Sequence, residues 1–164
     1  METPLCTVCL NSDILCAGCS RRLASGEITE TTVRTARALN ALAEKAPSLR
    51  EASLKTVLET PTHLLLIVSR GSAGKLVGKG GVVAKGLREA LGKSIRVIEE
   101  TTDARLFLQN ILFPIPVLGV GVRYANGSET LSVRVQRRRL PLSAEAVASI
   151  ALQVLKKPVE LTVQ

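Results

Sequence analysis

A cluster of glycines between two predicted helices constrains this 164-residue chain more than any other feature. The stretch LVGKGGVVAKGLREALG, residues 76–92, places Gly78, Lys79, Gly80 and Gly81 where one helical pattern stops and a longer one begins. Glycine inside a helix costs roughly 1 kcal/mol relative to alanine. Three glycines in four positions therefore predict a joint at which a ligand comes close to the main chain.

The segments around this joint alternate between helical and strand patterns. Pro47 ends the helix before it, Pro61 marks a turn between two strands, and Gly92 ends the helix after it. In chain order the predicted elements are a helix over 28–46, strands over 54–59 and 63–69, a short helix over 71–77, a helix over 82–92 and a strand over 94–100.

The second half of the chain repeats this order. The predicted elements are a helix over 102–113, a hairpin over 120–135, a helix over 143–157 and a strand over 158–163. Asn126-Gly127 in the hairpin is the strongest short-range turn signal that a sequence offers. LGKSIRVI, beginning at Leu91, aligns with LKKPVELT, beginning at Leu155, at an offset of 64 residues. At this offset the glycine joint falls on LSAE, residues 142–145, so the repeat has lost its glycines.

Composition restricts the class of partner. The net charge of +8 favours polyanions, either nucleic acid or an anionic membrane surface. The aromatic content of only 2% limits base stacking on rings. No run reaches the roughly 18 apolar residues that span a bilayer, and METPLCTVCL is unlike a signal peptide. We therefore expect an intracellular, cytoplasmic protein that binds nucleic acid and no membrane.

The glycine joint and the basic charge coincide. Seven basic residues and two acidic ones lie between Arg70 and Glu99. Backbone N–H groups and the positive end of the second helix attract anions, and the missing Cβ atoms let a phosphodiester chain lie against the backbone. The predicted binding residues are Gly78, Lys79, Gly80 and Gly81, the cations Arg70, Lys75 and Lys85, and Val77 and Val82, which with Val83 form an aliphatic groove for bases.

Other glycine-rich motifs do not fit the joint. A phosphate-binding P-loop requires GxxxxGK[ST], but Ala73 stands in place of its first glycine and Gly80 follows the lysine. The dinucleotide fingerprint GxGxxG fails because residue 83 is valine. A plain flexible loop between two helices stays open as an alternative.

All four cysteines of the chain lie in CTVCLNSDILCAGC, residues 6–19. Two CxxC turns that face each other supply the four thiolates of a closed, structural zinc site. The six residues between the pairs are fewer than in a zinc ribbon, so we expect one zinc ion in a minimal knuckle, with a disulfide as the alternative. The predicted ligands are Cys6, Cys9, Cys16 and Cys19. His63 is expected to be a partly buried strand residue.

The motif VGKGG between two short helices, inside a frame of strands and helices, resembles the GxxG loop of a KH domain. A further helix and strand before this core resemble the type II KH fold, in which three strands pack against three helices. Two such units in tandem resemble the short archaeal members of the NusA transcription elongation and termination family. The resemblance covers residues 28–164, with its sharpest motifs at RGSAGKLVGKGG and LGKSIRVIE. It implies that Gly78–Gly81 clamp about four nucleotides of single-stranded RNA.

This resemblance predicts an α+β protein of three modules: a zinc knuckle over 1–24, a KH domain over 25–101 and a degenerate KH domain over 102–164. The last has RRRLPLSAEA in place of a GxxG loop, so Arg137, Arg138 and Arg139 are expected to provide secondary RNA contacts at most. The four cysteines are an addition to the short family members. Residues 20–27, SRRLASGE, are predicted to be a basic linker.

The predicted function is non-catalytic binding of single-stranded RNA in transcription elongation or termination. No set of residues suggests catalysis or a small-molecule substrate. One alternative is a structural protein of the ribosome or another ribonucleoprotein, which would contact ribosomal RNA through Arg137–Arg139 and through Arg21 and Arg22. Another is an adaptor whose knuckle docks on RNA polymerase or another factor through Leu10, Ile14 and Leu15, predicted to be exposed, with packing of these residues on the first KH unit as the alternative.

Overall fold

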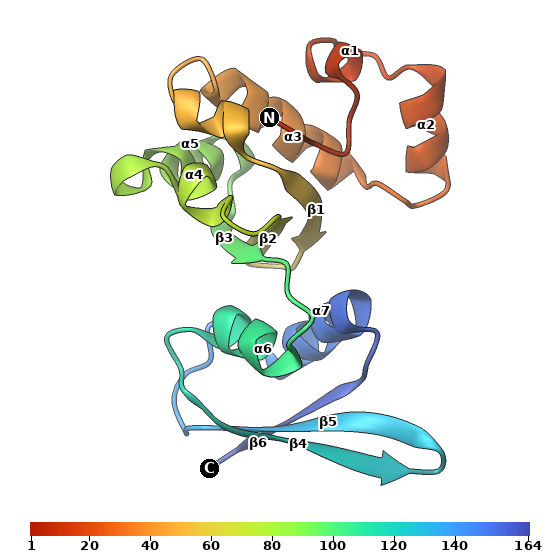
Figure 1. Ribbon diagram of the computed structural model, residues 1–164, viewed down its shortest axis with the longest axis vertical. Coiled ribbons are helices and arrows are strands. Elements are labelled where there is room, and N and C mark those ends of the chain that lie inside the picture. The colour runs from red at the N-terminus through yellow and green to blue at the C-terminus, as the bar shows by residue number, and fades with distance from the viewer. The chain divides into compact units, whose positions relative to one another are not determined.

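The computed structural model describes residues 1–164, apart from the side chain of Ala125. The chain separates into two compact units, Met1–Glu100 and Thr101–Gln164 (Figure 1). Each unit contains one three-stranded sheet together with helices, and the N-terminus carries a cluster of cysteines. The α+β class predicted from the sequence is confirmed.

The first unit begins with two short helices and continues into a mixed layer of helices and strands. Its elements are α1 (Thr7–Leu10), α2 (Ala17–Ala24), α3 (Glu30–Leu42), η1 (Pro47–Glu51), β1 (Leu54–Glu59), β2 (His63–Val68), α4 (Ala73–Val77), η2 (Lys79–Gly81), α5 (Val82–Leu91) and β3 (Ser94–Glu99).

The first sheet has the order β1-β2-β3. β1 and β2 form the predicted hairpin, which is antiparallel and is closed by Thr60, whose Oγ1 accepts a hydrogen bond from His63 N at 2.9 Å. β2 and β3 are parallel, with Leu64 opposite Ile95 and Val68 opposite Glu99. A parallel pair needs a crossover connection, which here consists of α4, η2 and α5.

The core of the first unit lies where α3, α4 and α5 pack against the sheet. Thr29 caps α3 by accepting a hydrogen bond from Thr32 N, and Val33, Ala36 and Leu39 are buried as their helical spacing predicted. Gly86 in α5 has a packing role, because a Cβ there would lie 2.9 Å from Leu42 Cδ2 of α3. The missing side chain at residue 86 leaves the space that Leu42 occupies between these two helices.

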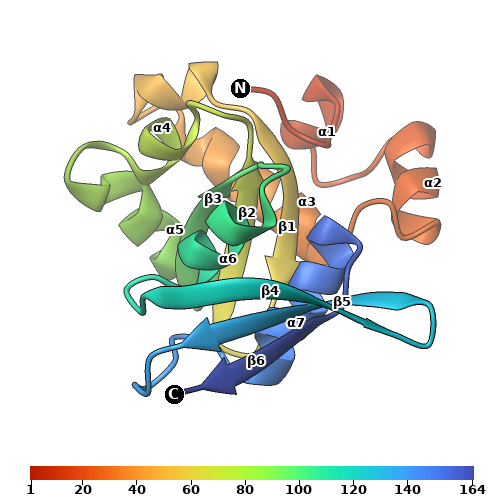
Figure 2. The ribbon, with the colours of Figure 1, turned by 60° about the horizontal axis from the view of Figure 1, so that its bottom comes forward.

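The second unit repeats the arrangement with one helix in its crossover. Its elements are α6 (Ala104–Leu112), β4 (Val117–Ala125), β5 (Ser128–Val135), α7 (Ala144–Leu155) and β6 (Val159–Val163). The sheet order is β4-β5-β6, with the first pair antiparallel and the second parallel, and Figure 2 shows the three strands side by side. Asn126 and Gly127 have φ angles of 51° and 76°, as the predicted hairpin turn requires.

The offset of 64 residues between the units has structural counterparts. Leu91 and Leu155 are the last residues of α5 and α7. Gly92 and Lys156 follow them, and both have left-handed backbone conformations, with φ angles of 72° and 58°. The next residue in each unit, Lys93 or Lys157, forms an ion pair with a glutamate of its own hairpin, at 2.6 and 2.7 Å. The helix ends and third strands therefore occupy equivalent positions.

These two helix ends provide a paired test of backbone strain. The left-handed conformation disfavours every residue with a Cβ by roughly 1–2 kcal/mol. Gly92→Ala should therefore lower the free energy of unfolding by about 1 kcal/mol, and Lys156→Gly should raise it by a similar amount or less. Chemical denaturation of each variant measures both effects. Equal effects of the same sign would contradict the assignment of these two caps.

Candidate nucleic-acid interface and metal centre

The glycine joint has a backbone that favours glycine at three positions. Gly78 follows α4 with φ 74° and ψ 165°, and Gly80 and Gly81 have φ angles of 65° and 76°. A Cβ on Gly78 would also lie 2.7 Å from Val83 Cγ2, whereas one on Gly80 would meet nothing within 4 Å. Backbone conformation thus explains the glycines, and the space around Gly80 leaves the main chain open to a ligand.

The joint is accessible from solvent. Lys79 and Gly80 are exposed, and Gly78 and Gly81 are half-buried. Gly81 N donates a hydrogen bond to Gly78 O at 3.0 Å, which closes a tight turn before α5 begins at Val82. The joint therefore presents its main chain on the surface at the start of a ten-residue helix.

A carboxylate from β3 positions the start of α4. Glu99 Oε1 accepts hydrogen bonds from Gly71 N at 2.9 Å and from Ala73 N at 3.2 Å. Ser72, between them, is buried, and its Oγ accepts a bond from Ser53 N at 3.1 Å. Sequence reasoning did not single out these residues. The available signal was the position of Glu99 at the carboxyl end of β3, which in a parallel pair lies beside the carboxyl end of β2.

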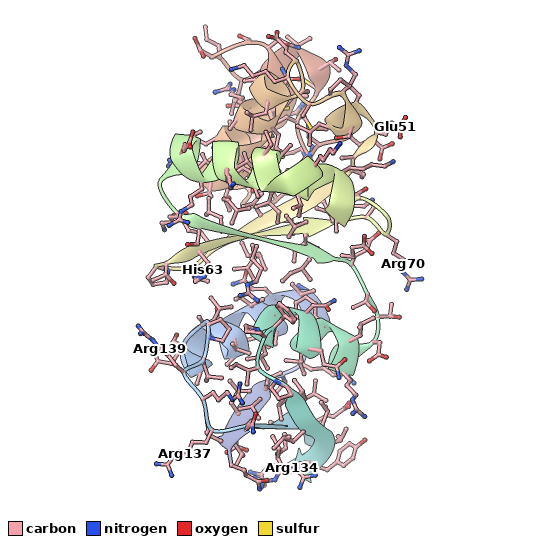
Figure 3. All side chains as sticks on the ribbon, turned by 90° about the vertical axis from the view of Figure 1, so that its left-hand side faces the viewer. Glu51, His63, Arg70, Arg134, Arg137 and Arg139 are labelled. Atoms are coloured by element: carbon pink, nitrogen blue, oxygen red, sulfur yellow. The ribbon has the colours of Figure 1, made fainter. Side chains whose placement is uncertain are left out.

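The cations predicted around the joint are not equivalent. Lys79 and Lys85 are exposed, and Figure 3 shows Arg70 extending outward after β2. Lys75 instead forms an ion pair with Glu51, 3.1 Å from Nζ to Oε2, and also donates to Glu51 O. Its charge is therefore partly compensated within the protein.

The aliphatic groove was predicted from three valines, and one of them is buried in the core. Val77 and Val82 flank the joint with 38% and 61% of their surface exposed. Val83 is 1% exposed and belongs to the core of the first unit, because its side chain fills the space beside Gly78. Its inclusion in the groove was wrong.

The cysteine cluster is built on two short helices with the same local geometry. Cys6 and Cys16 precede the first residues of α1 and α2 in extended conformations, and Cys9 and Cys19 lie three residues later inside the helices. Cys16 N donates to Cys9 Sγ at 3.1 Å, and Cys19 N donates to Cys16 Sγ at 3.4 Å. All four sulfur atoms lie within 4.8 Å of one another.

These distances fit a metal ion better than disulfides. The Sγ atoms of Cys6 and Cys16 are 3.9 Å apart, and all four cysteines are free. A disulfide requires about 2.05 Å between sulfurs, whereas tetrahedral zinc with Zn–S bonds of about 2.3 Å separates its sulfurs by about 3.8 Å. The cluster fits a zinc knuckle, and its four ligands would leave no position for a water molecule.

The knuckle is attached to α3. Cys9, Cys19 and Leu10 are buried in one cluster with Val33 and Ala36. The predicted exposure of Leu10 was therefore wrong, since it packs on the first unit. Leu15 is half-buried against the same cluster, and of the three predicted docking residues only Ile14 is largely exposed, at 79%.

Polar contacts between the knuckle and α3 strengthen this attachment. Arg37 Nε of α3 donates to Cys9 O at 3.1 Å, and Asn40 Nδ2 donates to Asn11 Oδ1 at 2.9 Å.

Part of the predicted basic linker is helical. Residues 20–24 belong to α2, which follows its N-cap Cys16. Arg22 of this helix donates hydrogen bonds to Pro4 O and to the carboxylate of Glu27.

The thiols differ in acidity. The N–H of Cys19 and the thiols of Cys9 and Cys19 lower the pKa of Cys16 to about 6. The pKa of Cys6 is also lowered, first by the N–H and then by the thiol of Cys9. The N–H of Cys16 acts in the same direction on Cys9, but burial and the neighbouring thiols outweigh it and raise the pKa of Cys9 to about 12.

This difference predicts selective alkylation of the metal-free protein. At pH 7 Cys16 is mostly thiolate, and because the thiolate is the nucleophile it should react with iodoacetamide well before Cys9. Its rate should fall as the pH drops below about 6, where the thiol becomes protonated. Peptide mass spectrometry after short exposures measures the order. Faster labelling of Cys9 than of Cys16 would contradict this arrangement.

The remaining predicted positions lie elsewhere. Arg137, Arg138 and Arg139 are exposed in the loop between β5 and α7, and Figure 3 shows Arg137 and Arg139 at the surface. α7 follows this loop directly, with Ser143 as its cap. His63 is a half-buried residue at the start of β2, as expected, and burial together with Arg96 lowers its pKa.

Known proteins resemble the chain in sequence and in fold. No family model matches it. The chain is 30% identical over 103 residues to the "Probable transcription termination protein NusA" of Methanocaldococcus jannaschii, covering 61% of this chain and 56% of that protein. It is 33% identical over 75 residues to the protein of the same name from Methanococcus vannielii, covering 46% and 43%. The predicted resemblance to archaeal NusA proteins is confirmed.

The extent of this resemblance is limited, because the chain spans about half the length of the curated relatives it matches. Among solved structures, the crystal structure of APE1850 superposes with a TM-score of 0.57 at 20% identity, over 78% of this chain and 96% of that one. This likeness shows a shared fold. Among the described residues, no helix combines the length and apolar character needed to cross a bilayer.

Proposed function

We propose that the chain is a non-catalytic RNA-binding protein whose first unit clamps a single RNA strand at Gly78–Gly81. The observation that carries this proposal is the solvent-accessible main chain of the joint at the start of α5, where the glycines have positive φ angles and a Cβ on Gly80 would meet nothing within 4 Å. Lys79 lies in the joint, Lys85 lies in the first turn of α5 and Arg70 precedes α4, and all three are exposed.

The topology supports a type II KH assignment for the first unit. A helix and a strand, α3 and β1, precede the core, and β2, α4, the joint, α5 and β3 follow in the order of the resemblance. The strand pairs are antiparallel and then parallel. The second unit has the same strand pairing without the joint, as a degenerate KH unit would. We assign the knuckle to residues 1–24 and the two KH units to 25–101 and 102–164.

The proposed clamp binds the backbone of RNA more than its bases. A phosphodiester lies against the main chain of Gly80, and Lys79 adds attraction that weakens with salt. Val77 and Val82 supply the apolar surface beside the joint, on which bases rest without an aromatic platform. Sequence preference should therefore be modest.

The clamp predicts the effect of negative charge at the joint. Lys79→Asp combined with Gly80→Asp places carboxylates and Cβ atoms where phosphate binds. The affinity for unstructured RNA should fall at least about tenfold, since charge-assisted contacts are lost and repulsion is added. Fluorescence anisotropy at several salt concentrations measures the change.

Lys45→Asp is the matched control for this experiment, because Lys45 is an exposed lysine of the same unit beyond the end of α3. It should reduce the affinity much less. Unchanged RNA binding by the joint variant would reject the clamp and favour the alternative hypothesis of a structural protein in a ribonucleoprotein. That hypothesis relied partly on Arg21 and Arg22, but the guanidinium of Arg22 already donates hydrogen bonds to Glu27 and to Pro4 O.

The cysteine cluster is proposed to hold one structural zinc ion through Cys6, Cys9, Cys16 and Cys19. Zinc bound to four thiolates supplies folding energy and no reaction centre. The purified protein should contain about one zinc per chain by elemental analysis, and Cys6→Ser with Cys9→Ser should abolish it. A protein that contains iron, or no metal when prepared without chelators, would contradict this assignment.

The proposed role in transcription termination rests on the two relatives, both described as probable transcription termination proteins, and the role in elongation rests on the resemblance to the NusA family. The proposed partners are single-stranded RNA and RNA polymerase, and a ribosomal subunit bound through ribosomal RNA is the alternative. Co-purification of the tagged chain with polymerase, and not with ribosomal subunits, distinguishes the two.

A further inference from the structure

The sheet of the second unit has one face packed on its helices and one open face. Leu131, Val133 and Val135 alternate along β5 and are buried on the inner face. The residues between them point to the other side, because side chains alternate along a strand. Figure 3 places Arg134 on this side, away from α6 and α7.

The strand register defines the open face. One row across the sheet contains Gly119, Arg134 and Thr162, and the next contains Gly121, Ser132 and Glu160. A third pair is Arg123 with Thr130. We name these eight residues the open sheet face. Its side chains are two arginines, three hydroxyls and one carboxylate, so it has neither aliphatic nor aromatic groups.

The two arginines are held in different ways. Arg123 forms an ion pair with Glu160, 3.2 Å from Nη1 to Oε2. Arg134 extends across the sheet over Gly119, since a Cβ on that glycine would lie 2.8 Å from Arg134 Nη2 and 3.3 Å from Nε. The missing side chain of Gly119 therefore allows the guanidinium of Arg134 to lie beside the β4 backbone, and Arg134 remains exposed.

The charge around Arg134 is strongly positive. Residues 130–143 contain Arg134 and Arg137–Arg139 and no acidic residue. The whole second unit has eight basic and four acidic residues. The carboxylate of the open face, Glu160, is already paired with Arg123. Among the described residues no ion pair is found for Arg134 or for Arg137–Arg139, although Arg137 N donates to the O atom of Gln164. Positive charge therefore lies on the face and on the loop that follows β5.

We propose that the open sheet face, together with the arginine loop at residues 137–139, is a second surface that binds the sugar-phosphate backbone of RNA without sequence preference. A guanidinium donates in pairs to phosphate, and the hydroxyls of Ser132, Thr130 and Thr162 match phosphate and ribose oxygens. This surface is separate from the glycine joint and requires only that the chain's polyanionic partner is RNA.

The chemistry of the face favours RNA over a protein partner. Protein interfaces centre on apolar and aromatic side chains, and the open sheet face has none. In this unit the exposed Val122 and Tyr124 belong to the alternate set of β4 positions that pair with Leu131 and Glu129, and the exposed Leu118 lies in the irregular step of β4 between Val117 and Gly119. Glycine in a strand interior also lets the backbone of a ligand approach the sheet closely. Gly121 is such a position, because a Cβ there would meet nothing within 4 Å.

Two variants of the full chain test this surface, each in the background of the joint variant with Lys79→Asp and Gly80→Asp. Arg134→Gln should weaken binding to a fluorescein-labelled, unstructured oligouridylate about tenfold and make the salt dependence shallower by about 0.7 in the log–log slope. Gly121→Thr should weaken binding several-fold while leaving the melting temperature unchanged or higher, because threonine suits a strand better than glycine does.

Arg105→Gln on α6 is the control, because it removes the same charge from an exposed position of the same unit. It should leave affinity within about twofold of its background. Equal losses for Arg105→Gln and Arg134→Gln, or unchanged binding by both open-face variants, would overturn the proposal. Loss with Arg134→Gln in a protein that tolerates the joint substitutions would support this surface and reject the clamp, so the two proposals fail separately.

Discussion

Parallel pairing of the middle strand with the last one is the constraint on which both units depend. Parallel neighbours cannot be joined by a tight turn, so the chain must leave the carboxyl end of β2 or β5 and return across the sheet. In the first unit this crossover contains the glycine joint, and in the second it contains three consecutive arginines. Each unit thus places its exposed cationic segment after the carboxyl end of its middle strand.

The joint also shows that one sequence signal can have two physical causes. The positive φ angles at Gly78, Gly80 and Gly81 favour glycine whether or not a ligand binds. At Gly78 the fold adds a second requirement, because Val83 occupies the space of a Cβ. Gly80 alone combines an exposed position with empty surroundings, so it reports on ligand approach more directly than its neighbours do. The glycines allow the backbone conformation of the joint, and the basic residues near it indicate that a ligand would be an anion.

Much of the fold followed from local patterns. The hairpins, the helix end at Gly92 and the alternating strands were predictable because periodicity and turn chemistry act within a few residues. The helix expected to run to residue 46 before Pro47 ends earlier, at Leu42. The contacts made by Glu99 and Lys75 were not predictable, since each depends on residues more than twenty positions away. Leu10 and Val83 were misplaced for the same reason: whether an apolar side chain is core or surface depends on what the remote chain brings against it. The spacing of the cysteines was more informative, because four ligands within fourteen residues need no distant partner.

Burial of Cys9, Cys19 and Leu10 against α3 has a consequence for how the cell sets the amount of folded protein. Since the same helix forms part of the main core, an ion held by the thiolates stabilises the folded first unit in proportion to the logarithm of its free concentration. Depletion of that ion would lower the folded population of the first unit without touching any residue of its glycine joint. Under the proposed function, the supply of that ion would set how much of the chain is folded and able to bind RNA, through the packing of α3.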